Sequence, residues 1–310
     1  NSPGFAPDVT SYDYDAPINE WGLTTPKFFE LRKMMEKYND GKKMPAIPKA
    51  PMPIITVPKF ELTEFAPLFG SVDTIFWGSQ KTFEEMDLGW GSVLYSVVLP
   101  EISTPSVLTA DIHDFAQIFI NGKYIGKIDR VKNEKSITLP PIKNHEQLSI
   151  LVEGMGRINF GRAIKDFKGI VGDLTITADI NNIETTWKPK VWIHEVMPDA
   201  YENALKAFTY YEKKKTQKRK VKYKVEGWFD VYDTDLAKGR GYYRGYFNLS
   251  KVGDTFLNFE TWGKGQVYVN GHAMGRIWSI GPQQTLYVPG CWLKKGKNEV
   301  IVLDVVGPKE

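Results

Sequence analysis

The sequence predicts a mainly β protein, with two β-sandwiches of jelly-roll type that follow a short strand–helix unit. Three observations lead to this fold class. A β-hairpin sequence occurs twice. Further strand-like blocks recur around it in the same order, and residues 1–40 predict a strand–loop–helix unit that differs from the β-domains after it.

The repeated hairpin lies at residues 116–128 and 265–277, an offset of 149 positions (265 − 116). In each copy, β-branched and aromatic residues lead into Asn-Gly. This dipeptide favours a type I′ turn, which needs positive φ at both central residues. A second glycine four positions on, Gly126 or Gly275, predicts a bulge or a close backbone approach.

Three more blocks pair up between the two halves at offsets of 149 to 152 positions (285 − 136 and 300 − 148). They are residues 91–99 with 241–249, 136–140 with 285–289, and 148–152 with 300–304. Blocks in register at a nearly constant offset predict two copies of one β-domain. We expect the first copy over residues 54–180 and the second over residues 222–310.

The remaining segments differ from these domains. Residues 1–40 predict one strand–loop–helix unit, with Thr25 as N-cap, Pro26 at the first helical position and the helix running to about Tyr38. Such a unit cannot bury its apolar faces alone, which indicates the last βα unit of a larger α/β domain. Residues 41–53 form a proline-rich linker. Residues 181–221 predict a second linker, with a helix from about residue 198 and then a basic run.

Composition and charge argue against several classes of function. The chain has 310 residues, a net charge of +3 and one cysteine, Cys291. The low net charge gives little support for nucleic-acid binding. The basic run of residues 213–224 is expected to be a solvated connector, with a polyanion-binding site as the alternative. No apolar run is long enough to predict a transmembrane segment. The four histidines show no metal-ligand spacing, so no metal or cofactor is expected.

Several stretches together resemble family 35 of the glycoside hydrolases, the β-galactosidases. Residues 10–17 and 24–37 resemble the end of that family's catalytic barrel. The other stretches resemble its first β-domain and its last domain, and they are residues 152–161 with 166–170, and residues 262–271 with 281–289. The resemblance implies two jelly-roll or galactose-binding-like sandwiches after the terminal βα unit of a TIM barrel.

The resemblance also implies an activity. Members are retaining exo-β-galactosidases, which remove terminal β-linked galactose with an acid/base and a nucleophile, both glutamates on upstream barrel strands. No catalytic residue is therefore expected in this segment, and alone it is expected to be inactive. The implied partners are a β-galactoside and the upstream barrel, with a homo-oligomer as a further option. The resemblance suggests a secreted, periplasmic or lysosomal protein.

Two places in the sequence are candidates for sugar contact. By resemblance, Tyr14 lines the galactose pocket at the end of the last barrel strand, although it could simply pack the barrel rim. Arg157, Asn159 and Phe160 lie in a glycine-bracketed loop that the resemblance places on the aglycone side. The family usually has tyrosine where this chain has Phe160, which can stack but has no hydroxyl. These side chains could instead tie the sandwich to the barrel.

Two other functions stay open at this point. The sandwiches could bind carbohydrate independently, because aromatic residues make up 13% of the chain and flat rings stack on sugar faces. Trp262 and Trp278 flank the second hairpin, and their rings could form a surface on which a sugar stacks. Packing at a domain interface is the simpler interpretation. Alternatively, the domains could be purely structural and support the barrel or an oligomer interface.

Overall fold

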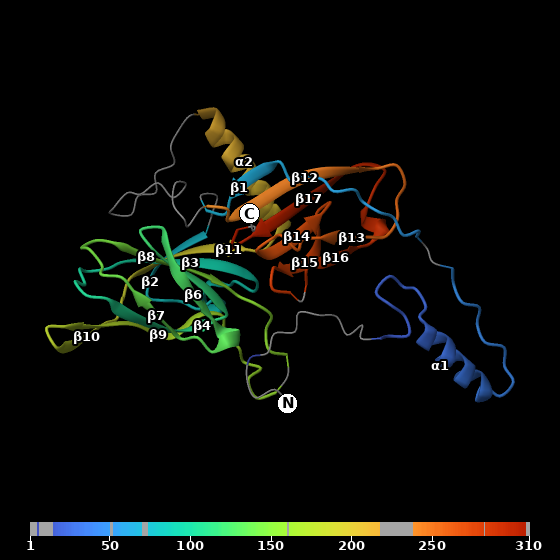
Figure 1. The fold of residues 1–310 in the computed structure, drawn as a ribbon, viewed down its shortest axis with the longest axis horizontal. Coiled ribbons are helices and arrows are strands. Elements are labelled where there is room, and N and C mark those ends of the chain that lie inside the picture. Colours follow the sequence, from blue (N-terminus) through green and yellow to red (C-terminus); the bar gives the residue numbers. More distant parts are fainter. Residues whose placement is uncertain are drawn as a thin grey trace. The chain divides into compact units, whose positions relative to one another are not determined.

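A computed structural model describes residue 5 and residues 15–49, 52–69, 74–159, 161–217, 238–281 and 283–307 (Figure 1). The chain divides into two compact units. Unit 1 comprises Asn1–Asp8 and Ala66–Tyr242, and unit 2 comprises Val9–Phe65 and Tyr243–Glu310. Most of the regular structure is β-strand, so the predicted mainly β fold class is confirmed.

Unit 1 is a β-sandwich of two antiparallel sheets. The six-stranded sheet has the order β2-β11-β3-β8-β5-β6 and the four-stranded sheet the order β10-β9-β4-β7, which Figure 1 shows as separate layers. The strands are β2 (Thr74–Gly78), β3 (Gly91–Val98), β4 (Ser106–His113), β5 (Phe115–Ile120), β6 (Lys123–Asp129), β7 (Ser136–Leu139), β8 (Gln147–Glu153), β9 (Gly169–Ile180), β10 (Ile183–Trp187) and β11 (Trp192–Pro198).

The core of unit 1 lies between these two sheets. Strand β4 alternates buried and more exposed residues, as expected for a sheet with one face in the core. Tyr95 and Trp192 from the larger sheet and Leu108 from the smaller sheet are all fully buried in one cluster. Short 3₁₀ helices follow β2 and β6, η1 (Glu84–Met86) and η2 (Arg130–Lys132), and helix α2 (Tyr201–Gln217) follows β11.

Unit 2 has a five-stranded sheet in the order β1-β12-β17-β14-β15 and a two-stranded sheet of β13 and β16. Its core includes the fully buried Val267, Val288 and Val302. The elements are α1 (Pro26–Lys37), β1 (Glu64–Pro67), β12 (Gly241–Leu249), β13 (Thr255–Asn258), β14 (Lys264–Val269), β15 (His272–Trp278), β16 (Thr285–Val288), η4 (Gly290–Trp292) and β17 (Gly296–Asp304).

The internal repeat is visible in the order of the strands. Unit 1 contains the order β3-β8-β5-β6 and unit 2 the order β12-β17-β14-β15. Strands at the same place in the two orders come from matching blocks of the sequence repeat. Both hairpins turn through Asn-Gly with positive φ, at 47° and 74° for the first and 48° and 86° for the second. In both, the register shifts beside the second glycine, Gly126 or Gly275, as predicted.

The two turn asparagines make equivalent contacts. Asn121 Oδ1 accepts a hydrogen bond of 2.8 Å from the backbone N–H of Gln147, which opens β8. Asn270 Oδ1 accepts one of 2.9 Å from the N–H of Glu299 in β17. Each asparagine also donates its own backbone N–H to the carbonyl oxygen of the same residue, Gln147 or Glu299, at 2.9 and 3.0 Å. Asparagine therefore fixes both the turn and its neighbouring strand.

The helix predicted near the N-terminus is present as α1. Pro26 occupies its first turn and Thr25 is the N-cap, but the Thr25 side chain does not cap the helix. Its hydroxyl instead donates to the carbonyl oxygens of Ala16 and Pro17, at 2.9 and 3.1 Å. No residue of α1 is buried among the described residues. In the part of the chain that the structure describes, no helix is long and apolar enough to cross a membrane.

The predicted domain boundaries remain predictions, but two packing features bear on them. Residues 52–65 pack with unit 2, where the Ile55 N–H donates to the carbonyl oxygen of Asp254 at 2.8 Å and Phe60 contacts the core. Strand β11 belongs to the larger sheet of unit 1, although its residues fall in the predicted second linker. Residues 8–14, where the strand of the predicted strand–loop–helix unit is expected, and most of the basic run lie outside the described residues.

The Gly265→Ala substitution tests the close packing of the second hairpin. A Cβ atom at Gly265 would overlap the backbone carbonyl oxygen of Leu303 in β17, whereas one at Gly89 would meet nothing within 4 Å. We expect Gly265→Ala to lower the free energy of unfolding by about 3 kcal/mol. Gly89→Ala should change it by less than about 1 kcal/mol. Urea unfolding of both variants measures the difference, and equal stabilities would contradict this packing.

Candidate functional site

The candidate site is the loop between β8 and β9, residues 154–168 of unit 1, which contains most of the predicted sugar-contacting residues. The loop begins against the core, because a Cβ atom at Gly154 would lie only 3.0 Å from the Phe83 ring. Its Gly154 N–H donates to the carbonyl oxygen of Gly91 at 3.1 Å. The loop therefore leaves the sheet at a fixed point.

A buried lysine holds the other end of the loop. Lys168 is only 1% exposed, and its Nζ donates to both carboxylate oxygens of Asp114, at 2.7 and 3.0 Å. The same ammonium donates to Asp166 Oδ2 at 2.6 Å and to the carbonyl oxygen of Gly156 at 3.2 Å. Lys168 thus joins the β4–β5 connection to both ends of the loop.

Arg130 balances the second negative charge of this cluster. Its guanidinium donates to Asp114 Oδ1 at 2.7 Å and to Asp166 Oδ1 at 2.8 Å. Asp114 Oδ2 also accepts the backbone N–H of Met155 at 2.6 Å. Two carboxylates therefore face two cations in a buried site, the arrangement in which burying charge is tolerated.

The pKa of Asp166 reflects this environment. Burial raises the pKa of its carboxyl, but the hydrogen bonds and charges of Lys168 and Arg130 outweigh burial, so that the pKa is lowered from its usual value. Asp166 is consequently held in the ionised form. The Phe5 ring packs over the same two cations, with Arg130 Cζ at 4.1 Å and Lys168 Nζ at 4.8 Å from its centroid.

His113, at the end of β4, binds the same loop. Its Nδ1 lies 2.6 Å from the carbonyl oxygen of Phe167 and 3.3 Å from Asp166 Oδ1. Because the carbonyl oxygen can only accept, the proton of this hydrogen bond is carried by Nδ1. The ring therefore adds a contact to the end of the loop that Lys168 already fixes.

Arg157 is one of the residues predicted to contact the aglycone, and its guanidinium is engaged within unit 1. It binds the Glu84 carboxylate of η1 and donates to the carbonyl oxygens of Asp166 and Gly89, at 3.1 and 3.2 Å. The Glu84 carboxylate also accepts the backbone N–H of Lys168. Arg157 therefore acts as a brace across the loop.

The tip of the loop is exposed. Asn159 is exposed, and Gly161 has a φ of 93°, with nothing near the place of a Cβ atom. Ile164 is 60% exposed. Tyr14 and Phe160, the other two predicted site residues, lie outside the described residues. The structure thus brings together Arg157 and the base of the loop and leaves Asn159 open to solvent.

The charged cluster is suited to holding the loop in position. Asp114 and Asp166 are both bound to cations, an arrangement that holds charge and is poorly suited to proton transfer. Among the described residues, no group of three His, Cys, Asp or Glu side chains is placed to hold a metal ion. The roles of Lys168 and Arg130 could not be predicted from the sequence. Lys168 is 54 positions from Asp114 in the sequence. The only nearby residue that hints at an ion pair is Asp166, two positions before it.

The two tryptophans near the second hairpin have different surroundings within unit 2. Trp278 lies under Lys264, whose Nζ is 4.7 Å from the ring centroid. Trp262 packs edge to face against Tyr243, with the ring centroids 4.9 Å apart, and lines a pocket of about 500 Å³. The two rings do not form a shared shelf in this pocket, because Trp278 is not part of its lining.

Three family models match the chain. Glycosyl hydrolases family 35 matches residues 1–38, the first all-beta domain of beta-galactosidase matches residues 81–189, and the galactose-binding domain of beta-galactosidase matches residues 241–298. They follow one another along the chain in the order that the sequence resemblance implied.

Curated relatives align with almost the whole chain. Beta-galactosidase-1-like protein 3 of Rattus norvegicus is 33% identical over 307 residues, which are 96% of this chain and 44% of the relative. Beta-galactosidase 17 of Arabidopsis thaliana is 31% identical over 331 residues, covering 98% and 44%. The chain thus spans less than half the length of these relatives. A Pleurotus ostreatus lectin structure in complex with GalNAc covers 83% of this chain and 80% of the lectin, at 12% identity and a TM-score of only 0.28.

Replacing Lys168 should destabilise unit 1 strongly. Lys168→Met leaves Asp114 and Asp166 with one cation between them, and breaking a buried ion pair costs about 3–5 kcal/mol. The matched control is Lys135→Met, because Lys135 forms an exposed ion pair with Asp111 at 3.3 Å. The control should cost less than about 1 kcal/mol. Urea unfolding followed by circular dichroism measures both, and a small effect at Lys168 would contradict the proposed anchor.

The lowered pKa of Asp166 predicts how stability depends on pH. A carboxyl whose pKa is lower in the folded than in the unfolded chain stabilises the fold above its unfolded pKa of about 3.9 and loses that contribution as the pH falls through the folded value. We therefore expect stability to fall below about pH 4. In Asp166→Asn this dependence should be weaker. Unfolding free energies measured from pH 2 to 7 would contradict this if both proteins gave parallel curves.

Proposed function

The chain belongs to glycosyl hydrolase family 35, and we propose that it forms the C-terminal part of a retaining exo-β-galactosidase. In this proposal the complete protein removes terminal β-linked galactose from glycans or oligosaccharides. The observation that supports it is the order of the three family models along the chain, together with β-galactosidase relatives that align with 96% or more of it.

We place the chemistry upstream of this segment. A retaining mechanism needs two carboxyl groups about 5–5.5 Å apart, one acting as acid/base and the other as nucleophile. In the cluster at the base of the 154–168 loop, each carboxylate is neutralised by Lys168 and Arg130, which fits a supporting role. The segment alone is accordingly proposed to be inactive and to support the barrel and the rim of the active site.

Individual residues have separate roles in this proposal. Tyr14 contributes to the galactose pocket, on the strength of the family motif around it. Asn159 and Phe160 present the loop tip to the aglycone. Arg157, which is bound to Glu84 and two carbonyl oxygens, positions the loop and leaves the sugar contacts to its neighbours.

A carbohydrate-binding module without catalytic function is the second candidate. The observation that favours it is the aromatic pocket beside Trp262 in unit 2. Saccharide binding by a chain that has no role in hydrolysis would support this candidate. A purely structural role remains the third candidate, and it predicts neither saccharide binding nor an effect of the loop on hydrolysis.

Hydrolysis of a chromogenic β-galactoside tests the main proposal. We expect no turnover above background with the 310-residue chain. We expect turnover when the chain is preceded by a family 35 barrel, because a complete (β/α)₈ barrel requires about 250 residues and carries the catalytic carboxylates. Mass spectrometry of the purified chain controls for a contaminating enzyme. Turnover by the chain alone would refute the proposal that it is inert and would assign the chemistry to its own carboxylates.

A further inference from the structure

Strand β2 forms one edge of the six-stranded sheet of unit 1, and among the described strands it pairs only with β11. Its five residues, Thr74–Gly78, include no charged residue and no proline. The opposite edge of the same sheet, β6, carries Lys123 and Lys127 and a bulge beside Gly126. Lysines, prolines and bulges keep edge strands from pairing with another chain. Strand β6 thus has this protection, and β2 lacks it.

The backbone of β2 directs hydrogen-bonding groups to this open edge. The carbonyl oxygen of Phe76 faces β11, because His194 Nδ1 lies only 3.3 Å from it. Backbone groups of successive residues in a strand point to alternate sides. Those of Ile75 and Trp77 therefore point to the outer edge, where no described segment forms a hydrogen bond with them. They are available to a further strand.

The exposed side chains of β2 are apolar. Trp77 is 63% exposed and Ile75 is 42% exposed. Both lie on the face of the sheet away from the sandwich core, since Phe76 between them packs against that core. Trp77 also lines an apolar pocket of about 250 Å³ with Val98 of β3 and Ile193 of β11. An apolar patch beside an open strand edge is typical of an interaction surface.

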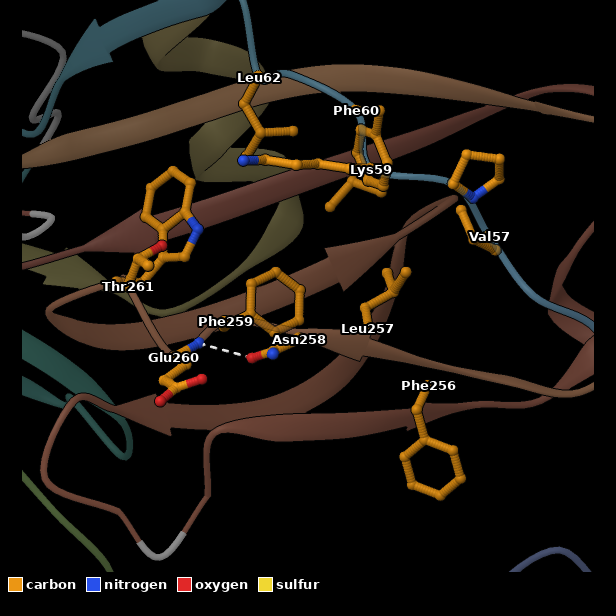
Figure 2. A pocket seen from close by; sticks show the side chains of 13 residues that line it. Val57, Lys59, Phe60, Leu62, Phe256, Leu257, Asn258, Phe259, Glu260 and Thr261 are labelled. Atoms are coloured by element: carbon orange, nitrogen blue, oxygen red, sulfur yellow. Dashed lines mark hydrogen bonds between the residues drawn. The ribbon is translucent and has the colours of Figure 1, made fainter.

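Unit 2 shows how such a strand can be covered within one unit. Strand β13 pairs with β16, and it also faces the extended segment 57–62 across a pocket (Figure 2). The chain before that segment is held beside the start of β13, where Ile54 forms a bridge with Asp254. In the part of unit 1 that the structure describes, no strand or bridge occupies the outer edge of β2.

A second copy of the same strand is complementary to this edge. When two antiparallel β2 strands are related by a twofold axis at Phe76, Ile75 of each chain lies opposite Trp77 of the other. These side chains share one face, so an aromatic and a β-branched side chain pair twice. The outward backbone groups of the same two residues meet in this register, and the uncharged strand brings no like charges together.

We propose that two copies of this chain associate through their β2 strands, antiparallel about Phe76, so that their six-stranded sheets join into one continuous sheet. The contact is small, because each chain contributes one strand of five residues. Interfaces below about 1,200 Å² are typical of weak and reversible complexes. We therefore expect a dissociation constant of about 10–100 µM.

Sedimentation velocity of the 310-residue chain at about 1–200 µM tests the association. We expect the mass to rise with concentration from that of one chain towards that of two. Ile75→Lys and Trp77→Lys should each weaken dimerisation at least about tenfold, because pairing would remove the ammonium group from water. The matched control is Ile183→Lys, which alters an exposed isoleucine of β10, an edge of the other sheet, and should leave dimerisation unchanged. Equal melting temperatures would establish that all three variants are folded.

Disulfide cross-linking tests the register. Opposite residues of a hydrogen-bonded pair have Cα atoms about 5.5 Å apart, which a disulfide can span. An equimolar mixture of Ile75→Cys and Trp77→Cys chains should therefore form a covalent dimer on mild oxidation. Either variant alone should cross-link much less, because its two cysteines would be diagonal neighbours about 7–8 Å apart. All chains carry Cys291→Ser, which removes the exposed native cysteine.

Four results would overturn the proposal: a monomer at every concentration, a dimer that neither lysine variant of β2 weakens, a dimer that Ile183→Lys weakens equally, or equal cross-linking in the mixture and in the single variants. None of these results depends on turnover of a galactoside. The test therefore fails or succeeds separately from the proposed hydrolase function.

Discussion

The buried ammonium of Lys168 is the interaction on which the candidate loop depends. A lysine with so little exposure is costly unless its charge is matched, and here two aspartates match it while Arg130 balances the second of them. The groups come from the ends of β4 and β6 and from both ends of the loop. Four distant chain segments consequently meet at one point, and the loop keeps its shape without regular secondary structure.

In both units, buried charged groups hold an irregular segment of the chain in place. In unit 2 the buried carboxylate of Asp304 accepts backbone N–H groups from Gly263, Lys264, Val306 and Gly307, which lie on two neighbouring segments. Burial raises the pKa of Asp304, and these backbone hydrogen bonds counteract part of that rise. A carboxylate surrounded by N–H donors therefore orders the turn beside the aromatic pocket, much as the ion cluster orders the loop in unit 1.

Features encoded locally could be predicted from the sequence, and those made by distant residues could not. Asn-Gly carries its own turn geometry, so both hairpin turns were predicted at the correct residues. Pro26 likewise marked the start of α1. By contrast, the ion cluster joins Asp114 to Lys168 across 54 positions, and residues 52–65 pack in unit 2 through contacts with Asp254. No local sequence pattern specifies such contacts. The same holds for Arg157, whose role as a brace depends on Glu84 and Gly89, about 70 positions away in the sequence.

The matching strand order and the paired asparagine contacts have a consequence for the history of this chain. One ancestral coding segment that was duplicated and fused would leave this record: the same hairpin, the same neighbouring strand and the same asparagine tie in both halves. After duplication, each copy could diverge wherever its frame was not constrained. The two copies differ in this way: the first has the charged cluster of Lys168 beneath the 154–168 loop, and the second has the aromatic pocket beside Trp262.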